Sequence, residues 1–592
     1  MKKISCKLII IAIIFSVASG ACEKSYLEKG PLGSTNISTL STKAGVDGLL
    51  IGAYAQLEKG GWPTGMWIFG GVASDDAHTG TEAGALQPIP AFESYTSDAS
   101  LYPLNDKWRS LYNGVQRAND VLRVLPKVSA DKITAVESTQ LKAEARFLRA
   151  VYHFTAAMIW RNVPYIDETI SFENENYNVS NKESIWPHIE ADFQFAADSL
   201  TPIKPDAGRA NNWAAKCFLV KAYMFQHKFA EAKPLLEDII TNGETANGKK
   251  YALCEKYEDN FDPAQRNNSE SVFAAQMSVN DGANGANGNT KNGIGFSGPF
   301  GGPIPTYGFY QPSFSLVNSF KTDPVMGLPL INNFNDFDIK NDQNISSSDP
   351  FVPYSGTVDS RLDWTVGRRG IPYLDWGINP GMNWVRQQIL AGPYLNVKGI
   401  CPQSEPQFQQ TYNKAVNDVY IRFADVLLWA AEVEVEIGSL SKAEMYVNLI
   451  RARAADPQGW VHTYIDPSNP LGGFTNIPAA NYKVGLYSGQ FTQNGQDFAR
   501  EAVRFERKIE LAMECHRFFD LQRYDNNTGY MADVLNAYIL HETTIPGYDF
   551  TYMNGAKFTK GKSEFFPIPQ AQIDLSTTKD GPTLVQNPGY GK

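Results

Sequence analysis

Cysteine and histidine are scarce in this chain, with 6 Cys and 7 His among 592 residues. The histidines show no HExxH or other zinc-ligand spacing, and the cysteines form no CxxC pair. Beyond the N-terminal region the cysteines are Cys217, Cys254, Cys401 and Cys515. They encode no disulfide framework, and Cys217 and Cys515, which lie within helical patterns, are expected to be buried free thiols.

The chain also lacks an excess of basic residues, since 53 Lys and Arg stand against 63 Asp and Glu, for a net charge of -10. Nucleic-acid binding needs clustered Lys and Arg, so nucleic acid is excluded as a partner. Long apolar runs are missing after the first 22 residues. With 43% hydrophobic and 20% charged residues, the composition indicates a soluble globular protein that does not span a membrane.

Catalytic motifs are missing as well. The sequence has no GxSxG elbow, no phosphate-binding Gly-rich loop after a strand, and no Cys/His protease signature. Paired carboxylates stay open, because a glycosidase needs only two acids that are close in space. Asp75, Asp76 and Asp375 are the acids to consider, but adjacent or lone acids usually serve as turn or hydrogen-bonding residues. We therefore predict no catalytic residue, and a binding protein rather than an enzyme.

The N-terminus has the pattern of a secretory signal over residues 1–21. Two lysines precede an apolar run from Leu8 to Val17 that is too short to span a bilayer, and small residues then lead into Cys22. The residues before Cys22 form a lipobox, although Ser19 stands where leucine is usual; an ordinary signal-peptidase site would give the same cut. We predict a lipid on Cys22 and a polar tether over 22–40 that anchors the protein to a membrane.

Helical periodicity dominates residues 41–241. Its best segment, Leu141 to Trp160, repeats small and large apolar residues at steps of three and four. The segments Trp213 to Gln226 and Phe229 to Ile240 form a helix-turn-helix that resembles a degenerate tetratricopeptide repeat. Because such repeats do not bury their faces alone, several are expected to stack into a curved scaffold.

Residues 242–416 differ in composition and in hydrophobic pattern: Gly, Asn and Pro are frequent, aromatic residues are dense, and the periodicity is irregular. This predicts a loop-rich insertion with short strands, which we take as the ligand-binding region. Within it, the Gly/Asn tract Asp281 to Gly293 is expected to be mobile, and Phe296 to Tyr310, where Gly and Pro alternate with Phe and Tyr, is expected to be ordered.

Helical patterns return over residues 417–592, at Asn417 to Ile437, Lys442 to Ala454 and Asp497 to Tyr524, and Gly438 is the expected terminator of the first. The predicted fold class is therefore mostly α: a tetratricopeptide-repeat-like helical scaffold with a large loop-rich insertion containing short strands.

Several segments in these regions resemble the ordered motifs of the SusD/RagB family of outer-membrane nutrient-binding lipoproteins. They are Ala143–Pro164, Tyr420–Glu432, Asn448–Ala454, Arg504–Tyr524, Phe566–Pro569 and Gln586–Tyr590. The matches run from the signal peptide to the last residues, so the resemblance covers essentially the whole chain. A further block, Asp363 to Gly381, resembles one branch of the family, whereas Cys515 stands where the family more often has Gly, a departure that concerns packing only.

These motifs have a structural interpretation first. The segment Arg504 to Tyr524 carries acids and arginines at helical spacing, which predicts an ion-pair network that holds helices together. Its members are Glu506, Glu510, Glu514, Arg507, Arg517 and Arg523. Arg422 and Asp425, three apart on a predicted helix, are expected to serve the same purpose.

The resemblance implies a function at the outer membrane. It implies a lipid-anchored, surface-exposed protein that binds an oligosaccharide and delivers it to a SusC-like TonB-dependent transporter. Two alternatives stay open: capture of a peptide, as by members resembling RagB, which would use backbone hydrogen bonds in a groove, or a transporter lid without a ligand site of its own.

A sugar stacks its C–H faces on aromatic rings and pairs its hydroxyls with polar side chains, so a glycan site is expected where loop aromatics stand beside Asp, Asn and Arg. The predicted ligand-binding residues are Trp62, Trp67, Asp75, Asp76, Tyr307, Tyr310, Arg368, Tyr373, Trp376 and Trp384, with Trp364 and Arg369 in the same cluster. The scaffold tryptophans are expected to be Trp108, Trp160, Trp213 and Trp429, which lie in helical apolar stripes.

No cofactor is predicted. One cluster has enough oxygen ligands for a structural calcium ion but lacks the spacing and the glycine of a known calcium loop. It consists of Asn335, Asp336, Asp338, Asn341 and Asp342.

Overall fold

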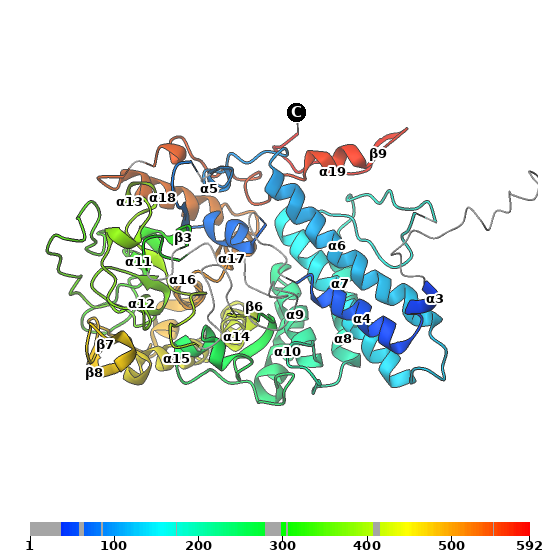
Figure 1. Cartoon of the computed structure of the whole chain (residues 1–592), viewed down its shortest axis with the longest axis horizontal. Helices are drawn as coiled ribbons and strands as arrows, with labels where there is room; N and C mark the ends of the chain where they lie inside the picture. The colour runs from blue at the N-terminus through cyan, green and yellow to red at the C-terminus, as the bar shows by residue number, and fades with distance from the viewer. Residues whose placement is uncertain are drawn as a thin grey trace, which may run out of the picture.

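The computed structural model of the chain describes residues 37–57, 64–84, 87–172, 174–278, 298–302, 306–405, 415–548 and 550–591 (Figure 1). The signal segment, Cys22, Trp62 and the tract Asp281 to Gly293 lie outside these described residues. The expectations for them therefore stay predictions.

Helices make up the N-terminal part of the molecule, at the right and centre of Figure 1. They are α3 (Ile37–Leu40), α4 (Lys43–Tyr54), the π-helical turn η1 (Trp67–Val72), α5 (Pro90–Glu93), α6 (Tyr102–Val124), α7 (Ala135–Trp160), α8 (Trp186–Ser199), α9 (Asn212–Phe225) and α10 (Phe229–Asn242). From α6 to α10 each helix packs on the next one in the chain. Stacking of helical hairpins in chain order confirms the predicted repeat scaffold.

Helix α7 is the centre of this scaffold. A capping box starts it, in which Thr134 accepts from the backbone N–H of Glu137 and the Glu137 carboxylate accepts from that of Thr134. The stripe predicted along it is buried, from Ala143 through Phe147 to Phe154. Because α6 and α8 both cover α7, most of its C-terminal half is buried all round.

The scaffold continues across the loop-rich insertion, because α10 packs directly on α14. The C-terminal helices are α14 (Phe423–Ile437), α15 (Leu440–Ala455), α16 (Gln490–Glu510), α17 (Arg517–Asp525), α18 (Tyr530–Thr544) and α19 (Gln570–Leu575). Helices α14, α15 and α16 pack on one another in turn, and α14 ends at Gly438, as predicted. Helix α19 returns to lie against α6, so the end of the chain contacts its N-terminal layer (Figure 1).

Three local predictions are wrong. The helix expected from Asn417 starts only at Phe423. The residues before it form strand β6 (Asp418–Arg422), which pairs with strand β2 (Ser271–Ala275). The helix expected over Asp497 to Tyr524 is broken between α16 and α17. Cys515 lies in that break with a positive φ of 66° and is half-buried, so it is neither helical nor fully buried.

The insertion contains short strands, as predicted, and also short helices, which were not predicted. In the described residues it holds, besides β2, the helices α11 (Phe314–Ser319), α12 (Leu362–Thr365) and α13 (Gln388–Ala391) and the strands β3 (Phe309–Pro312), β4 (Val366–Gly367) and β5 (Leu395–Asn396). Elsewhere lie β1 (Ala77–Gly80), β7 (His462–Tyr464), β8 (Phe474–Pro478), β9 (Thr577–Thr578) and β10 (Gly581–Pro582). The described strands pair as antiparallel two-stranded ribbons: β1 with β3, β2 with β6, β4 with β5, β7 with β8, and β9 with β10.

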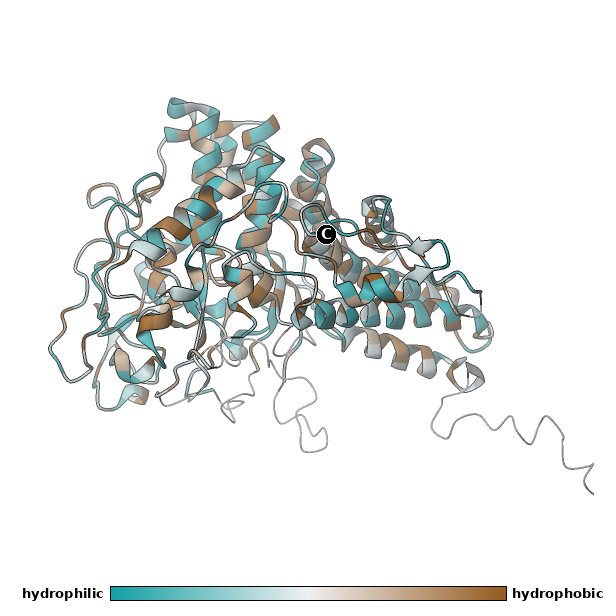
Figure 2. Cartoon of the chain, turned by 90° about the horizontal axis from the view of Figure 1, so that it is seen from above, coloured by the Kyte–Doolittle hydropathy of each residue, from teal (hydrophilic) through white to brown (hydrophobic). Residues whose placement is uncertain are grey.

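One contiguous hydrophobic core runs from α4 to the last residues of the chain. The scaffold tryptophans are buried in it as predicted: Trp108, Trp160, Trp213 and Trp429. Apolar and polar residues alternate along the helices in Figure 2, as expected for helices with one face on a core. Among the described residues, no helix is both long enough and apolar enough to cross a bilayer.

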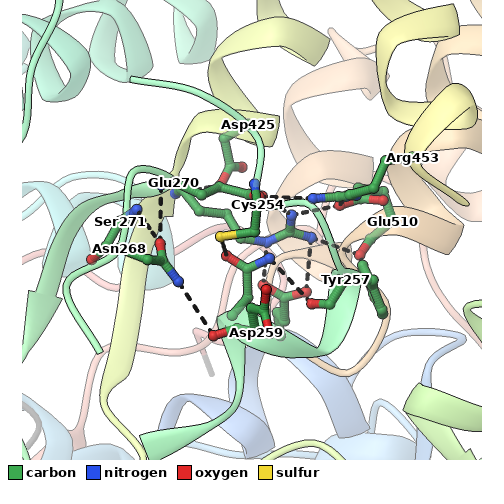
Figure 3. A network of polar contacts seen from close by, with 12 residues as sticks. Cys254, Tyr257, Asp259, Asn268, Glu270, Ser271, Asp425, Arg453 and Glu510 are labelled. Carbon is green, nitrogen blue, oxygen red and sulfur yellow. Dashed lines mark hydrogen bonds and ion pairs between the residues drawn. The ribbon is translucent and has the colours of Figure 1, made fainter. Parts of the chain in front are cut away.

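The predicted ion-pair network holds the helices together, and its partners come from distant parts of the chain. Glu510 accepts from Arg361, Arg422 and Arg453, and all four side chains are buried. Glu270, just before β2, pairs with Arg422 at 2.7 Å. It also pairs at 2.7 Å with Arg453, which in turn contacts Glu510 (Figure 3). Because each charge has several partners, the network ties α15 and α16 to the β2–β6 ribbon.

A second branch of the network joins α14, α16 and α17. Arg507 pairs with Asp425 at 2.8 Å and with Asp520 at 2.7 Å, while Arg523 contacts Asp520 and Glu432. Burial raises the pKa of Asp520, but the charges of Arg507 and Arg523 outweigh it and lower that pKa to about 2. The branch therefore fixes α17 against α14 and α16.

Candidate functional site

Three of the aromatics predicted to form an exposed ligand platform are core residues. Trp67, Tyr310 and Tyr373 are each 1% exposed. The Trp67 ring lies 5.7 Å from the ring of Tyr310 and 5.9 Å from that of Phe309, and the Tyr373 hydroxyl donates to the carbonyl of Asn396. The expected exposure is wrong here because Gly-rich segments let these rings pack inward instead of marking surface loops.

The two adjacent acids are also buried. Asp75 pairs with Arg517 at 2.7 Å and with Lys508 at 2.8 Å, and Asp76 accepts from the backbone N–H of Met513 at 3.1 Å. Burial raises the pKa of Asp75, but the charges of Arg517 and Lys508 outweigh it and hold the pKa below its usual range. Burial and the neighbouring Asp75 raise the pKa of Asp76 to about 7. These carboxylates hold the fold and present no face to a ligand.

Arg368, which was predicted to bind ligand, is also buried and paired within the protein. It binds both carboxylate oxygens of Asp363, at 2.6 and 2.8 Å, and the Tyr482 hydroxyl donates to Asp363 as well. Arg369 donates to three backbone carbonyls. Asp375 accepts from two backbone N–H groups, as its expected role in a turn requires.

Trp376 and Trp384 are half-buried at the edge of a small second hydrophobic cluster. The Trp376 indole N–H donates to the carbonyl of Cys401 at 2.9 Å, and the Trp384 ring meets Tyr373 edge to face at 5.7 Å between centroids. Each ring is therefore partly covered by the protein and partly open. The exposure predicted from the Gly- and Pro-rich flanks is thus only partial.

Beside Trp384 the structure exposes two further rings. Phe300 is 43% exposed and Tyr307 is 40% exposed, and the Arg386 guanidinium lies 4.5 Å from the first ring centroid and 5.7 Å from the second. We call Phe300, Tyr307, Trp384 and Arg386 the aromatic surface. Of its four members, Tyr307 and Trp384 were predicted from sequence.

The backbone holds this surface in place. The N–H of Phe300 donates to the carbonyl of Trp384 at 2.8 Å, and a Cβ on Gly301 would lie 2.0 Å from the carbonyl oxygen of Asn383. Only glycine allows so close an approach of the two segments.

The arginine is fixed by the segment after β1. Its Nη1 donates to the Thr81 hydroxyl at 3.1 Å, and its Nη2 pairs with the Glu82 carboxylate. Sequence reasoning missed Phe300, Arg386 and Glu82. Phe300 stands in a segment rich in Gly, Pro and aromatics, which was its one signal, whereas nothing local marks Arg386 or Glu82.

Chemically, the aromatic surface offers what a sugar needs. Exposed ring faces stack on C–H groups, and a guanidinium and a carboxylate beside them can pair with hydroxyls. The guanidinium also limits the freedom of the two rings, which lowers the entropy lost when a ligand binds.

Comparison with known families gives this geometry its context. Residues 269–590 match the family model described as "SusD family", which covers more than half of the chain. The chain belongs to the SusD family. Residues 25–224 of the SusD-family chain also match a second model, described as "Starch-binding associating with outer membrane".

Curated relatives of the SusD-family chain are similar over long stretches. SusD-like protein P25 of Formosa agariphila is 24% identical over 555 residues, which are 90% of this chain and 91% of that protein. A SusD-like protein of Bacteroides ovatus is 27% identical over 285 residues, which are 46% of this chain and 49% of that protein.

Solved structures share the fold of the SusD-family chain. A structure named "Laminarin binding SusD-like protein" aligns over 93% of this chain and 100% of its own, with a TM-score of 0.61 and 22% identity. Surface glycan-binding protein A from Bacteroides thetaiotaomicron, in complex with laminarihexaose, aligns over 92% and 99%, with a TM-score of 0.61 and 18% identity. A SusD superfamily protein from Parabacteroides distasonis has a TM-score of 0.64, 20% identity and coverage of 93% and 99%.

The oxygen-rich cluster considered for calcium in the SusD-family chain has partners within the protein. Asp338 accepts from Asn318 at 2.7 Å and pairs with His541 at 3.1 Å, whereas Asp342 accepts from Gln388. In the part of the chain that the structure describes, no group of three or more His, Cys, Asp or Glu side chains could hold a metal ion.

Proposed function

We propose that this SusD-family protein binds glycan at the aromatic surface and passes it to a SusC-like TonB-dependent transporter, without covalent chemistry. The observation that carries the proposal is the pair of rings, Phe300 and Tyr307, exposed beside a guanidinium fixed by Glu82. The names of the structural neighbours, which bind laminarin or laminarihexaose, support a glycan as the ligand.

The cellular site is part of the same proposal. The description of the N-terminal family match supports association with the outer membrane. The lipobox before Cys22 supports a lipid anchor, from which the described domain would hang on the tether 22–40. Replacing Cys22 with serine is expected to move the protein from the membrane fraction to the soluble fraction.

The test of binding is native affinity electrophoresis of the chain from Glu23 onward, with laminarin, starch and other polysaccharides in the gel. At least one glycan is expected to retard the protein, and Tyr307→Ala and Phe300→Ala are each expected to weaken the retardation. Phe172→Ala is the matched control, since Phe172 is an exposed aromatic in another part of the molecule. Retardation that all three variants keep equally would refute the aromatic surface as the site.

The alternatives are separate outcomes of this experiment. If no glycan retards the protein but a peptide digest binds it, the protein captures peptides. If neither binds, the protein is a transporter lid without its own ligand. Delivery is tested by purifying the tagged full-length protein from detergent-solubilised membranes of its native host. A β-barrel transporter in near-equal amount is expected, and its absence contradicts the partner proposed.

A further inference from the structure

A cavity of about 150 Å³ lies between the N-terminal helices and the C-terminal half of the molecule. Helices α6, α7 and α9 supply one wall, and strand β6, helix α14 and residues 513–520 supply the other. None of the four aromatic-surface residues lines it. The cavity is therefore a separate feature of the fold.

Aromatic rings form most of the apolar wall. They include Trp67, Tyr152, Phe154, Phe218, Phe225 and Phe519. Polar side chains also line it, among them Gln56, Ser110, Thr155 and Asn417. A cavity with this lining suits a ligand that has a ring and a few polar groups.

Lys221 on α9 is the unusual member of the lining. Its side chain is only 9% exposed, and its Nζ lies 5.8 Å from the ring centroid of Phe154. No described side chain or backbone carbonyl accepts a hydrogen bond from this ammonium, and no described carboxylate forms an ion pair with it. The ring of His516, also on the wall, has no hydrogen-bond partner among the described residues either.

Three other cations on the wall, Lys398, Arg507 and Arg523, have acidic partners. Lys398 pairs with Glu514 at 2.7 Å, and Arg507 and Arg523 share the carboxylate of Asp520. Lys221 thus differs from them in lacking an anion within contact distance. Burying a charged group without a partner is costly.

The ammonium nevertheless stays charged near neutral pH. Burial lowers the pKa of Lys221 to about 8. The negative charge of Asp425, which lies beyond ion-pair distance, acts in the opposite direction but is the weaker effect. A group with that pKa is mostly protonated at pH 7. The cavity therefore presents a positive charge on an aromatic wall.

We propose that this cavity binds a small ligand consisting of one six-membered ring and a carboxylate, whose carboxylate pairs with Lys221 while the ring packs against the aromatic wall. The volume fits this class, because a cavity of about 150 Å³ accepts a ring the size of benzene. A sugar acid and an aromatic acid share this chemistry.

The test is isothermal titration calorimetry of the chain from Glu23 onward with glucuronate and with benzoate, and with glucose and benzamide as neutral counterparts. At least one acid is expected to bind at least about tenfold more tightly than its neutral counterpart, as a charge-assisted hydrogen bond would give. Binding of glucuronate alone identifies a sugar acid, and binding of benzoate alone an aromatic acid. The neutral counterparts test the charge without any mutation.

Lys221→Met is expected to abolish the preference for the acid, and to raise the thermal unfolding midpoint because it removes an unpaired buried charge. Lys216→Met is the control, since Lys216 lies on the same helix but pairs with Asp238 outside the cavity. The proposal is overturned if no acid binds at millimolar concentration, if acid and neutral counterpart bind alike, or if Lys221→Met binds the acid as well as the natural chain does. Because the site shares no residue with the aromatic surface, its failure leaves glycan binding there untouched.

Discussion

The Asp75 carboxylate accepts a hydrogen bond from Arg517 Nε at 2.7 Å, although the two residues are 442 positions apart in the chain. Both are buried, and Lys508 adds a second cation to Asp75 at 2.8 Å. The contact joins the segment after η1 to the start of α17. Asp75, which was predicted from sequence to bind ligand, thus stabilises the contact between the N-terminal and C-terminal parts of the fold.

Asp75→Asn is expected to destabilise the protein by about 3–5 kcal/mol, the usual cost of breaking a buried ion pair on one side. Arg517 and Lys508 would then stay buried with too little negative charge. Urea unfolding at pH 7 measures the effect. A loss below about 1 kcal/mol would show that solvent reaches these cations.

The neighbouring acid is expected to respond in the opposite way. The folded-state pKa of Asp76 is about 7, above its usual value of 3.8, because of burial and the charge of Asp75. The folded protein therefore binds the extra proton between these two values, and its stability falls as pH rises through them. Asp76→Asn does not ionise and is expected to gain about 2–4 kcal/mol relative to the natural chain between pH 4 and pH 8. Unfolding curves at both pH values check this, and an equal difference at both would contradict it.

His78 gives a pH dependence on the alkaline side. Its ring lies between Glu93 at 2.7 Å and Glu542 at 2.8 Å, and all three are buried. Burial lowers the pKa of His78, but the hydrogen bonds to Glu542 and Glu93 outweigh it and raise that pKa to about 9. The stability from this cation is therefore complete below pH 6.5 and is lost as pH rises through 9.

His78→Gln is expected to lower stability by about 2–3 kcal/mol at pH 6 and to reduce the fall in the unfolding midpoint between pH 6.5 and 9. Part of the fall remains, because burial lowers the pKa of His541 but its hydrogen bonds to Asp338 and Glu542 outweigh it and raise that pKa to about 9 as well. Differential scanning calorimetry from pH 6 to pH 10 follows both changes. His188→Gln serves as the control, since the His188 ring stacks on Tyr165 away from the two glutamates. A natural chain with a flat profile over this range would mean that His78 is neutral when folded.

Much of the scaffold could be predicted because helix formation depends on local spacing. The alternation of Ala143, Phe147 and Phe154 is enough to place the buried side of α7, and Gly438 marks the end of α14. The errors arose where tertiary pairing overrides the local pattern. Strand β6 forms from residues that read as helix because β2, nearly 150 positions earlier, offers an edge to pair with.

The candidate site was harder to predict, for a physical reason. Exposure depends on which segments pack together, and the same Gly-rich flanks surround the buried Tyr310 and the exposed Tyr307, three residues apart. Arg386 becomes part of the aromatic surface through Glu82, a contact over 304 positions that no local pattern encodes. The sequence showed that the Glu and Arg residues of Arg504 to Tyr524 form ion pairs, but it did not show which residues of other segments they pair with.

Glycine positions offer a matched pair of substitutions. A Cβ at Gly70 would lie 1.9 Å from the backbone oxygen of Cys515, whereas a Cβ at Gly48, on the exposed side of α4, meets nothing within 4 Å. Gly70→Ala is expected to cost about 1–3 kcal/mol through overpacking. Gly48→Ala is expected to add about 0.5–1 kcal/mol, because alanine loses less backbone entropy in a helix. Thermal unfolding of both variants measures the contrast, and the same sign of change in both would contradict it.

Arg386 is expected to act on glycan binding through the rings it holds. Arg386→Ala removes the guanidinium beside Phe300 and Tyr307, so both rings would have to be ordered by the ligand itself, at about 0.5–1.5 kcal/mol for each side chain. Affinity for a retarding polysaccharide is expected to fall about tenfold or more, as measured by affinity electrophoresis over a series of glycan concentrations. Arg161→Ala is the control, because Arg161 lies over the ring of Phe565 in another part of the molecule. If Arg386→Ala binds as tightly as this control, the rings are held without the arginine and its place beside them is incidental to binding.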